Sequence, residues 1–249
     1  MSALTCGCNA TGYDPKSPED DGPSAPKVVK VETAEATFDT EVKELSSMCF
    51  NAAHDGFYAV SDGGKVYELN LDGTTRNVLY DDGEYDWEGI DWDGSTIWLE
   101  EESESALYTL KNGKLTKVVE IEIPDGGVSG KGPEGMMCKG DTIYVANQAQ
   151  PTRIVKYCKT TGTVSGAFDI TFTKKFLSDL CYDATDNTMW IVDSKAPAFY
   201  HSTLDGKLLA TYEIPLTLIA QAEALVIDRE AGYAWVGCDV KSKIYKIKL

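Results

Sequence analysis

Polar residues recur at nearly constant intervals along this chain, and their oxygen-bearing side chains are suited to binding a hard metal ion. Successive members of the series are 42, 46, 44 and 45 residues apart. Ca²⁺ takes about six to eight oxygen ligands, whereas Mg²⁺ demands fewer protein ligands and a tighter geometry, so such a ring favours Ca²⁺. The five members are Ser46, Glu88, Glu134, Ser178 and Glu223.

A second polar series follows an aromatic residue that recurs in every copy of the repeat. The aromatics are Tyr58, Trp98, Tyr144, Trp190 and Trp235. Each is followed three or four positions later by a polar pair: Ser61 with Asp62, Glu101 with Glu102, Asn147 with Gln148, Asp193 with Ser194, and Cys238 with Asp239. Because the start of one antiparallel strand lies beside the end of the next, both series should share one face.

We therefore predict a ring of acids around one end of a central channel, with Ca²⁺ as its cofactor. The predicted metal ligands are Glu88, Glu134, Glu223, Asp179, Asn147 and Asp193. The predicted ligand-binding residues at the same end are Asp62, Trp87, Gln148, Arg153 and Asp239. The alternative for the acids is that they bind backbone amides of neighbouring repeats and hold the repeats together. The alternative for Trp87 is core packing.

The elements that position these residues are short strands. Each repeat contains four β-rich runs, and the third and fourth are separated by turn pairs such as Asp72-Gly73 and Asn112-Gly113, which are strong hairpin signals. Repeats of this length with four strands each predict an all-β, five-bladed β-propeller with four-stranded antiparallel blades. The last repeat lacks a fourth strand, so we expect the run Val28–Glu32 to complete it. Residues 27–249 are predicted to form the propeller, and residues 1–26 a signal remnant and polar linker.

Familiar catalytic arrangements are poorly represented in the chain. Its two histidines, His54 and His201, are predicted to lie away from the acidic ring, so a histidine general base is not expected there. The sequence has neither a nucleophile elbow nor a phosphate-binding glycine loop. A carboxylate-based, metal-assisted hydrolysis remains open, and Glu101 and Glu102 are then the candidate general bases.

The composition of the chain limits the classes of partner and the cellular locations that it can have. The formal net charge of −17 argues against nucleic acid, because phosphate contacts need clusters of Lys and Arg. No run of residues is long and apolar enough to span a membrane. The small residues before Cys8, and before Cys6 as second choice, resemble the end of a lipoprotein signal followed by a polar tether. This predicts a lipid-anchored protein of the cell envelope, in the periplasm or on the outer membrane; a cytoplasmic protein is the alternative. The remaining cysteines show no metal-site spacing and are expected to be free thiols.

The motifs resemble those of the SdiA-regulated propeller family of bacterial envelope proteins. They are Leu45–Met48 (LSSM), Trp87–Ile90 (WEGI), Pro133–Met136 (PEGM), Ile97–Glu101 (IWLEE) and Met189–Ser194 (MWIVDS), and the resemblance covers residues 40–249. It implies a propeller in an exported or anchored location. The Glu-Gly pairs at Glu88 and Glu134, and the matching Glu223, are also similar to the acids of calcium-dependent propeller hydrolases such as gluconolactonases. This resemblance implies that Glu88, Glu134 and Glu223 face a channel calcium. Those enzymes have six blades, whereas this chain has five repeats.

Two functions follow from these observations. In the first, the protein is a non-catalytic, monomeric binding or scaffold propeller of the envelope, whose partner is another protein, a glycan or a small molecule. In the second, it is a metal-dependent hydrolase of a small ester, lactone or phosphoester. The first is favoured because no set of residues for proton transfer is complete.

Overall fold

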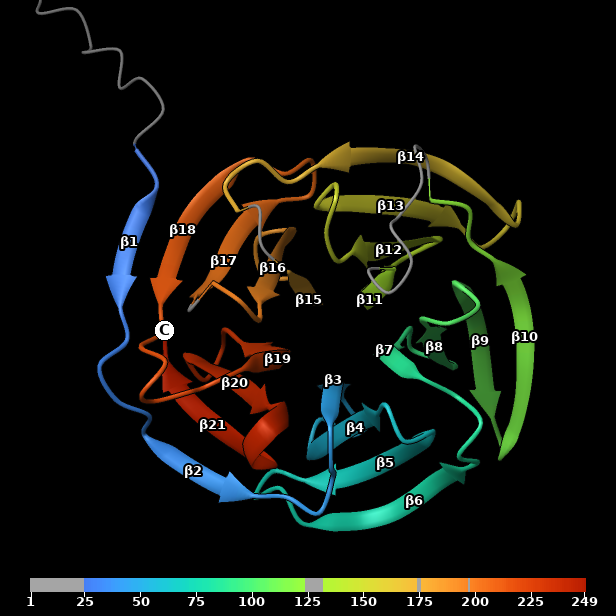
Figure 1. Ribbon diagram of the computed structural model, residues 1–249, viewed down its shortest axis with the longest axis horizontal. Helices are drawn as coiled ribbons and strands as arrows, with labels where there is room; N and C mark the ends of the chain where they lie inside the picture. Colours follow the sequence, from blue (N-terminus) through green and yellow to red (C-terminus); the bar gives the residue numbers. More distant parts are fainter. Residues whose placement is uncertain (1–24, 124–131, 174–175, 197) are drawn as a thin grey trace, which may run out of the picture.

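Five sheets surround a central axis in the computed structural model, which describes residues 25–123, 132–173, 176–196 and 198–249 (Figure 1). Within each blade the strands are antiparallel and follow one another outward from the axis. Blades 1 to 4 contain, in that order, β3–β6 (Leu45–Phe50, Gly56–Ser61, Lys65–Asn70, Thr75–Asp81), β7–β10 (Trp87–Trp92, Ile97–Glu101, Ala106–Lys111, Lys114–Glu120), β11–β14 (Pro133–Lys139, Thr142–Asn147, Arg153–Cys158, Thr163–Asp169) and β15–β18 (Leu177–Asp183, Thr188–Asp193, Ala198–Thr203, Leu208–Glu213). Blade 5 contains β19–β21 (Ala222–Asp228, Tyr233–Cys238, Lys243–Lys248). The predicted five-bladed β-propeller is confirmed.

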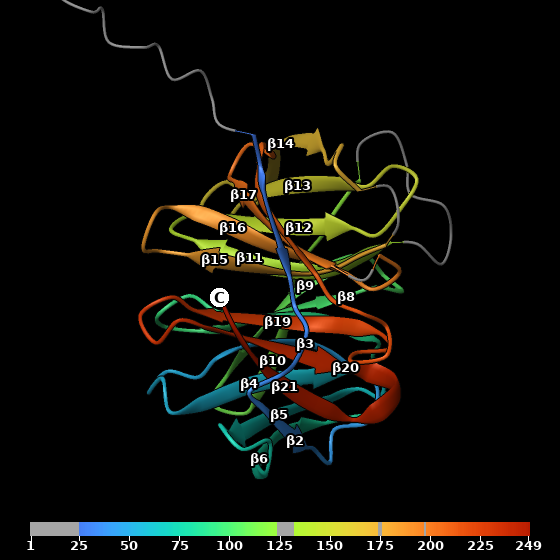
Figure 2. The same ribbon diagram turned by 90° about the vertical axis from the view of Figure 1, so that its left-hand side faces the viewer.

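An N-terminal strand closes the ring, as predicted, but it is not the predicted segment. The closing strand is β2 (Ala36–Asp39), which pairs antiparallel with β21. The run beginning at Val28 instead forms β1 (Lys27–Lys30), a fifth strand that pairs parallel with β18 on the outer edge of blade 4 (Figures 1 and 2). Composition could not separate the two segments, because two of the four residues are apolar in each strand, KVVK in β1 and ATFD in β2.

The hairpin predictions hold where turn chemistry is strongest. Asn112 and Gly113 both adopt positive φ angles, of 52° and 72°, and Gly73 has a φ of 79°. These conformations suit the right-handed twist of the strands that they join.

Apolar side chains fill the five seams between neighbouring blades. The recurring aromatic of each blade packs against the next blade, so that Trp98 of blade 2 contacts a cluster from blade 3 and Trp235 of blade 5 contacts a cluster from blade 1. Replacing a buried aromatic of this kind with Ala typically costs ~3–5 kcal/mol of stability. The second-strand aromatics therefore fix the angle at which blades meet, and with it the spacing of residues at the axis.

The described residues form neither disulfide bonds nor a helix that could span a membrane. All five cysteines among them are free thiols, as predicted: Cys49, Cys138, Cys158, Cys181 and Cys238. No helix in these parts of the chain has the length and apolar character needed to cross a membrane. The predicted lipidation sites Cys6 and Cys8 lie outside the described residues.

Candidate functional site

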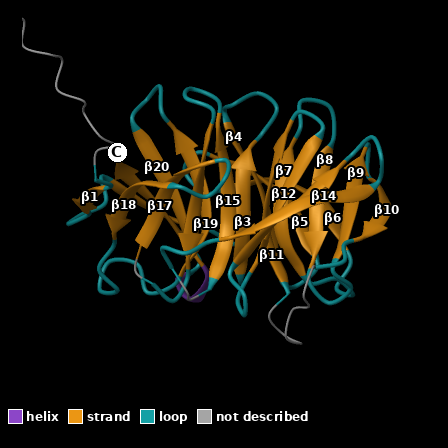
Figure 3. Ribbon diagram, turned by 90° about the horizontal axis from the view of Figure 1, so that it is seen from above, coloured by secondary structure: helices purple, strands orange, loops and turns teal. Residues whose placement is uncertain are grey.

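One end of the channel collects the two polar series of the sequence. In Figure 3 it is the lower face, marked by the short 3₁₀ helix η1 (Asp239–Lys241). The Ser46 hydroxyl donates a hydrogen bond to Asp62, and the Gln148 amide donates one to Glu134, each pair lying within a single blade. We call this end the acidic mouth.

A β-bulge positions the first-strand residue of the acidic mouth in every blade. The ladder register shifts between Trp87 and Gly89, so that Glu88 has no partner on β8, and equivalent shifts occur at the start of β3, β11, β15 and β19. A bulge bends the strand and re-aims the extra side chain, and bulges are frequent beside active sites. The bulge explains why five strand-one residues point to the same opening.

Three carboxylates on the blade 1 and blade 2 side form the tightest group. Asp62, Asp86 and Glu88 each offer one oxygen, and these oxygens all lie within 4.8 Å of one another. Burial, followed by the charge of Glu134, raises the pKa of Glu88 well above its ordinary value. Burial, followed by Asp62 and Glu102, raises the pKa of Asp86 to about 6.

Blade 5 contributes a second acidic pair, joined by an amide. Gln221 Nε2 donates to Glu223 Oε1 at 2.7 Å and to Asp239 Oδ2 at 3.1 Å. Burial raises the pKa of Glu223 to about 7, and the nearby acids Asp239 and Asp62 reinforce this rise. Lys195, from the same end of blade 4, opposes the rise at both acids.

Glu134 connects the two sides of the acidic mouth. Burial raises its pKa, and the nearby charges of Glu102, Glu223 and Asp62 raise it further. Carboxylates that are buried together and repel one another are stabilised by a proton or by a cation. The donor set consists of oxygens throughout, so these residues fit a hard divalent cation such as Ca²⁺.

Asp179, predicted above as a metal ligand, lies instead inside the channel. Its side chain is completely buried, and it accepts hydrogen bonds from Ser47 Oγ, Leu225 N and Leu180 N, each at 2.9 Å. The Ser47 hydroxyl in turn accepts the amide of Ile90 at 3.2 Å. Asp179 therefore holds blades together across the axis, which is the alternative that the sequence left open.

Asn147, Asp193 and Glu101 also serve the loops rather than the acidic mouth. Asp193 Oδ1 accepts three backbone amides, including Ala196 N at 2.8 Å. Asn147 Nδ2 donates to the carbonyls of Ala149 and Pro151. The two oxygens of Glu101 accept the amides of Asp86 and Glu104, at 3.3 and 2.7 Å. In these three pairs of the second polar series, the first residue binds the backbone of loops at this end of its blade.

Two further predicted ligand-binding residues interact within their own blades, although both stand at strand ends on the side of the acidic mouth, Trp87 opposite Glu101 and Arg153 opposite Asn147. Trp87 is completely buried and packs between Tyr85 and Tyr108, at ring-centroid distances of 4.5 and 5.3 Å. Arg153 forms an ion pair with Asp169 of the adjacent strand, at 2.6 Å. Trp87 supports blade 2 from within and presents no stacking surface to a ligand.

Asp86, Glu100 and Gln221 were not predicted from the sequence as site residues. Asp86 and Gln221 stand just before a first strand, outside both repeating series, so periodicity gave no signal for them. Glu100 could have been recognised from the sequence, because it is an acid at a position of the second strand where the other blades have an apolar residue or glycine. Those residues are Val60, Ala146, Val192 and Gly237.

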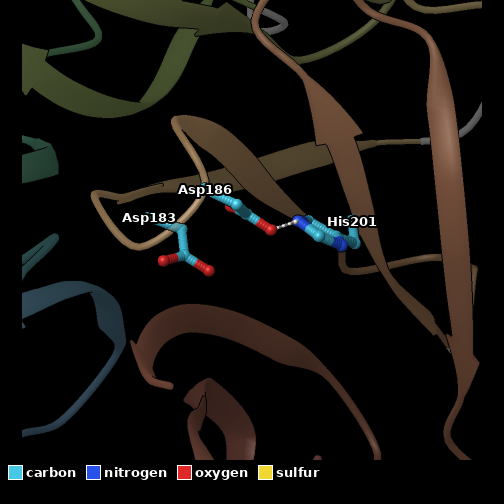
Figure 4. A group of neighbouring side chains, drawn as sticks. All are labelled: Asp183, Asp186 and His201. Atoms are coloured by element: carbon cyan, nitrogen blue, oxygen red, sulfur yellow. Dashed lines mark ion pairs between the residues drawn. The ribbon is translucent and has the colours of Figure 1, made fainter. Parts of the chain in front are cut away.

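The opposite end of the propeller carries a mixed cluster of acids and a histidine. Asp183, Asp186 and His201 each offer a ligand atom within 4.8 Å of the others (Figure 4). His201 Nε2 lies 3.5 Å from Asp186 Oδ2 and 2.7 Å from Thr188 Oγ1. Arg229 of blade 5 lies 3.6 Å from each of the two acids. The guanidinium already balances these acids, so we interpret the cluster as a clamp between blades 4 and 5.

A cavity of about 570 Å³ opens beside that clamp, and its lining includes Cys49, Asp91 and Cys181. Asp91 Oδ2 accepts the backbone amide of Cys138 at 2.5 Å, which ties blade 2 to blade 3. Burial raises the pKa of the Cys49 thiol well above its ordinary value, and neutral thiols are poor nucleophiles. Neither histidine of the chain lies at the acidic mouth, as predicted.

Comparisons with solved structures agree on the fold. The chain is similar to glutaminyl cyclase of Myxococcus xanthus, with a TM-score of 0.67 and 9% identity over 90% of this chain and 98% of that one. It is also similar to the gluconolactonase XC5397 of Xanthomonas campestris, with a TM-score of 0.56 and 14% identity over 85% of this chain and 88% of that one. A chain of a nidogen/laminin complex matches with a TM-score of 0.55 and 14% identity, over 79% of this chain and 73% of that one. At these identities the likeness shows the propeller fold alone.

Family membership rests on a sequence match. A search of curated proteins found no match. Residues 40–178, more than half of the chain, match the family described as "Phytase-like: Esterase-like activity of phytase". The likeness to the SdiA-regulated family remains a resemblance of motifs. The chain belongs to the phytase-like propeller family.

Proposed function

We propose that this protein is a cation-dependent binding propeller whose acidic mouth holds Ca²⁺ and, through it, an anionic ligand. The observation that carries this proposal is the group formed by Asp62, Asp86 and Glu88, whose oxygens lie within 4.8 Å of one another. These three residues would hold the ion, and the ion would supply positive charge at an opening that is otherwise dominated by acids. An anionic molecule would be repelled from this opening without it.

The first experiment is a thermal melt of the full chain in EDTA, followed by addition of Ca²⁺ or Mg²⁺. An ion that binds the folded state alone, at about 100 times its Kd, adds ~2.7 kcal/mol of stability. For a chain of this size that corresponds to a rise in Tm of about 5–10 °C. A rise with Ca²⁺ that exceeds the rise with Mg²⁺ supports the proposal. Equal melting temperatures under all three conditions would overturn it.

A second candidate function, favoured by the family match, is metal-dependent hydrolysis of phosphate or carboxylate esters. The bound cation would supply Lewis-acid chemistry. Glu102 would be the general base, because the Gly132 amide binds one of its oxygens at 3.2 Å and orients the side chain, and because burial raises its pKa. Glu101 is excluded from this role, because backbone amides occupy both of its oxygens.

Hydrolysis is tested with phytate, p-nitrophenyl phosphate and p-nitrophenyl acetate in the presence of Ca²⁺. If the protein is a hydrolase, Glu102→Gln should lower turnover by about 10²–10⁴-fold, the range typical of general-base removal, and should leave folding intact. If no substrate turns over, the binding function stands alone. The matched control is Glu230→Gln, an exposed acid near the opposite end.

A separate proposal concerns the cellular location of the protein. We propose that Cys8, or Cys6, carries a lipid that anchors the protein in the bacterial envelope, where its partner is a protein, a glycan or a small molecule. Metabolic labelling with a fatty-acid analogue tests this by comparing wild type with Cys8→Ser, with Cys6→Ser and with the double variant that carries both substitutions. Label that persists in the double variant, or absence of label in the wild type, would contradict it.

A further inference from the structure

Glu100 is a buried acid at a position where the fold does not require one. It is the fourth residue of β8 and pairs with Gly89 in the blade 2 ladder. The corresponding residues of the other blades are apolar or glycine: Val60, Ala146, Val192 and Gly237. Four blades form the same strand pair without a carboxylate, so the acid has a reason other than folding.

The Glu100 side chain has no partner in the part of the chain that the structure describes. Its exposed fraction is 0%, and neither carboxylate oxygen accepts a hydrogen bond. A carboxylate removed from water without partners is strongly penalised, and such groups are normally paired or bound to a metal. The charged groups that act most strongly on Glu100 are themselves acids, with Glu134 first.

Another oxygen without a donor lies beside Glu134. Gln148 donates its amide nitrogen to Glu134, whereas its own side-chain oxygen is buried and accepts no hydrogen bond from the described residues. Two oxygens of Glu100 and one of Gln148 therefore lack donors near the seam between blades 2 and 3. Gly89, the ladder partner of Glu100, lies at this seam, since a Cβ there would be 3.2 Å from the backbone nitrogen of Met136 in blade 3. A cation is the kind of partner that such oxygens lack, since carboxylate and amide oxygens are the usual ligands of Ca²⁺.

We propose that Glu100, Glu134 and Gln148 hold a second divalent cation, deeper than the first and between blades 2 and 3. The proposal rests on the proposed function in one respect, namely that the acidic mouth binds cations. Glu100 is not part of the group within 4.8 Å at Asp62, Asp86 and Glu88, so it belongs to a separate ion. A side chain at Gly89 would press on Glu100, since a Cβ there would lie 2.9 Å from that of Glu100.

The test is isothermal titration of the metal-free full chain with CaCl₂, comparing wild type, Glu100→Gln, Glu100→Val and Asp62→Asn. Glu100→Val copies the residue of blades 1 and 4, so it offers a second fold-compatible variant if the amide is not tolerated. We expect two bound ions in the wild type. Both Glu100 variants should lose one ion, or bind it at least about tenfold more weakly, while Asp62→Asn weakens the other. The Glu230→Gln variant controls for the loss of one negative charge.

The outcomes separate the two proposals. If the Glu100 variants bind Ca²⁺ like the wild type while Asp62→Asn binds weakly, the deep site is wrong and the proposed function stands. If only the Glu100 variants are affected, the deep site stands and the Asp62 group fails. If the wild type binds no Ca²⁺, both fail. A crystal structure with Ca²⁺ checks the deep site without any substitution. The proposal requires an ion within about 2.3–2.6 Å of a Glu100 oxygen.

Discussion

The Ser47 hydroxyl donates to the Asp179 carboxylate at 2.9 Å, and the two residues come from blades 1 and 4, which are not neighbours in the ring. The bond therefore crosses the propeller axis. The same carboxylate accepts the Leu225 amide of blade 5, and the Ser47 hydroxyl accepts the Ile90 amide of blade 2. Two side chains thus join four of the five blades at the centre.

We expect Asp179→Ala to destabilise the protein by about 3–5 kcal/mol, because it leaves buried donors in three blades without an acceptor. Asp179→Asn should not restore stability, since its amide nitrogen would face backbone N–H groups. Urea unfolding followed by tryptophan fluorescence measures both. Loss of less than 1 kcal/mol in the Ala variant would show that the central bonds do not hold the blades.

We expect the metal-free protein to lose stability as the pH rises from 5 to 8. Glu223 has a pKa of about 7 when folded, against an ordinary value of 4.5, so the folded chain holds a proton that the unfolded chain releases. The resulting penalty is absent below the unfolded pKa, grows as the pH rises, and is complete above the folded pKa. For this residue the change between pH 5 and pH 8 is on the order of 2 kcal/mol. Chemical denaturation in EDTA at the two pH values checks it.

The matched control for this pH dependence is Glu223→Gln, whose stability should vary less over the same interval. A stability profile that rises towards pH 8 in the wild type would contradict the burial of uncharged acids at the acidic mouth.

Combining Glu134→Gln with Glu223→Gln should have opposite effects on two measurements. The Tm in EDTA should rise, because two mutually repelling acids are removed. The additional rise caused by Ca²⁺ should shrink, because the cation at the acidic mouth loses nearby negative charge and the proposed deep cation loses its ligand Glu134. Exposed acids at Glu120 and Glu230 provide a double-Gln control of equal charge change. An unchanged Ca²⁺ response would show that the ring of acids is not the binding site.

Truncation should separate the roles of β1 and β2. A chain that begins at Val31 loses β1, whose residues are mostly exposed, and should keep a cooperative melt within a few degrees of the full chain. A chain that begins at Thr40 also loses β2, which leaves blade 5 with three strands and the outer edge of β21 unpaired. We expect that chain to aggregate or to unfold well below the full chain. Equal melting temperatures would mean that closure adds little.

The blade count, the hairpins and the shared face of the two polar series could be predicted from the sequence, because each depends on local spacing. The different roles of the two residues within each polar pair could not be predicted. Adjacent residues such as Glu101 and Glu102 are chemically alike, and the loop bonds that separate them depend on backbone geometry. Asp179 resembled the other acids of its series, but it stands one position later, where the bulge turns it inward instead of towards the opening.

The edge pairing of β1 also could not be predicted, because Val28–Glu32 and the true closing strand differ little in composition. Glu100 could have been recognised. Aligning the five second strands would have shown one charged residue among apolar ones, and a charged exception inside a repeat is a stronger signal than a member of the repeating series.

The parallel pairing of β1 with β18 determines at which face of the propeller the N-terminal segment enters. β18 runs towards the acidic mouth, ending at Glu213, and β1 runs with it from Lys27 to Lys30. The chain therefore enters the propeller at its rim, on the side away from the acidic mouth, and the last strand, β21, also ends on that side. A support or a fused domain joined directly at Lys27 or Leu249 would therefore start from the face of the propeller opposite the acidic mouth.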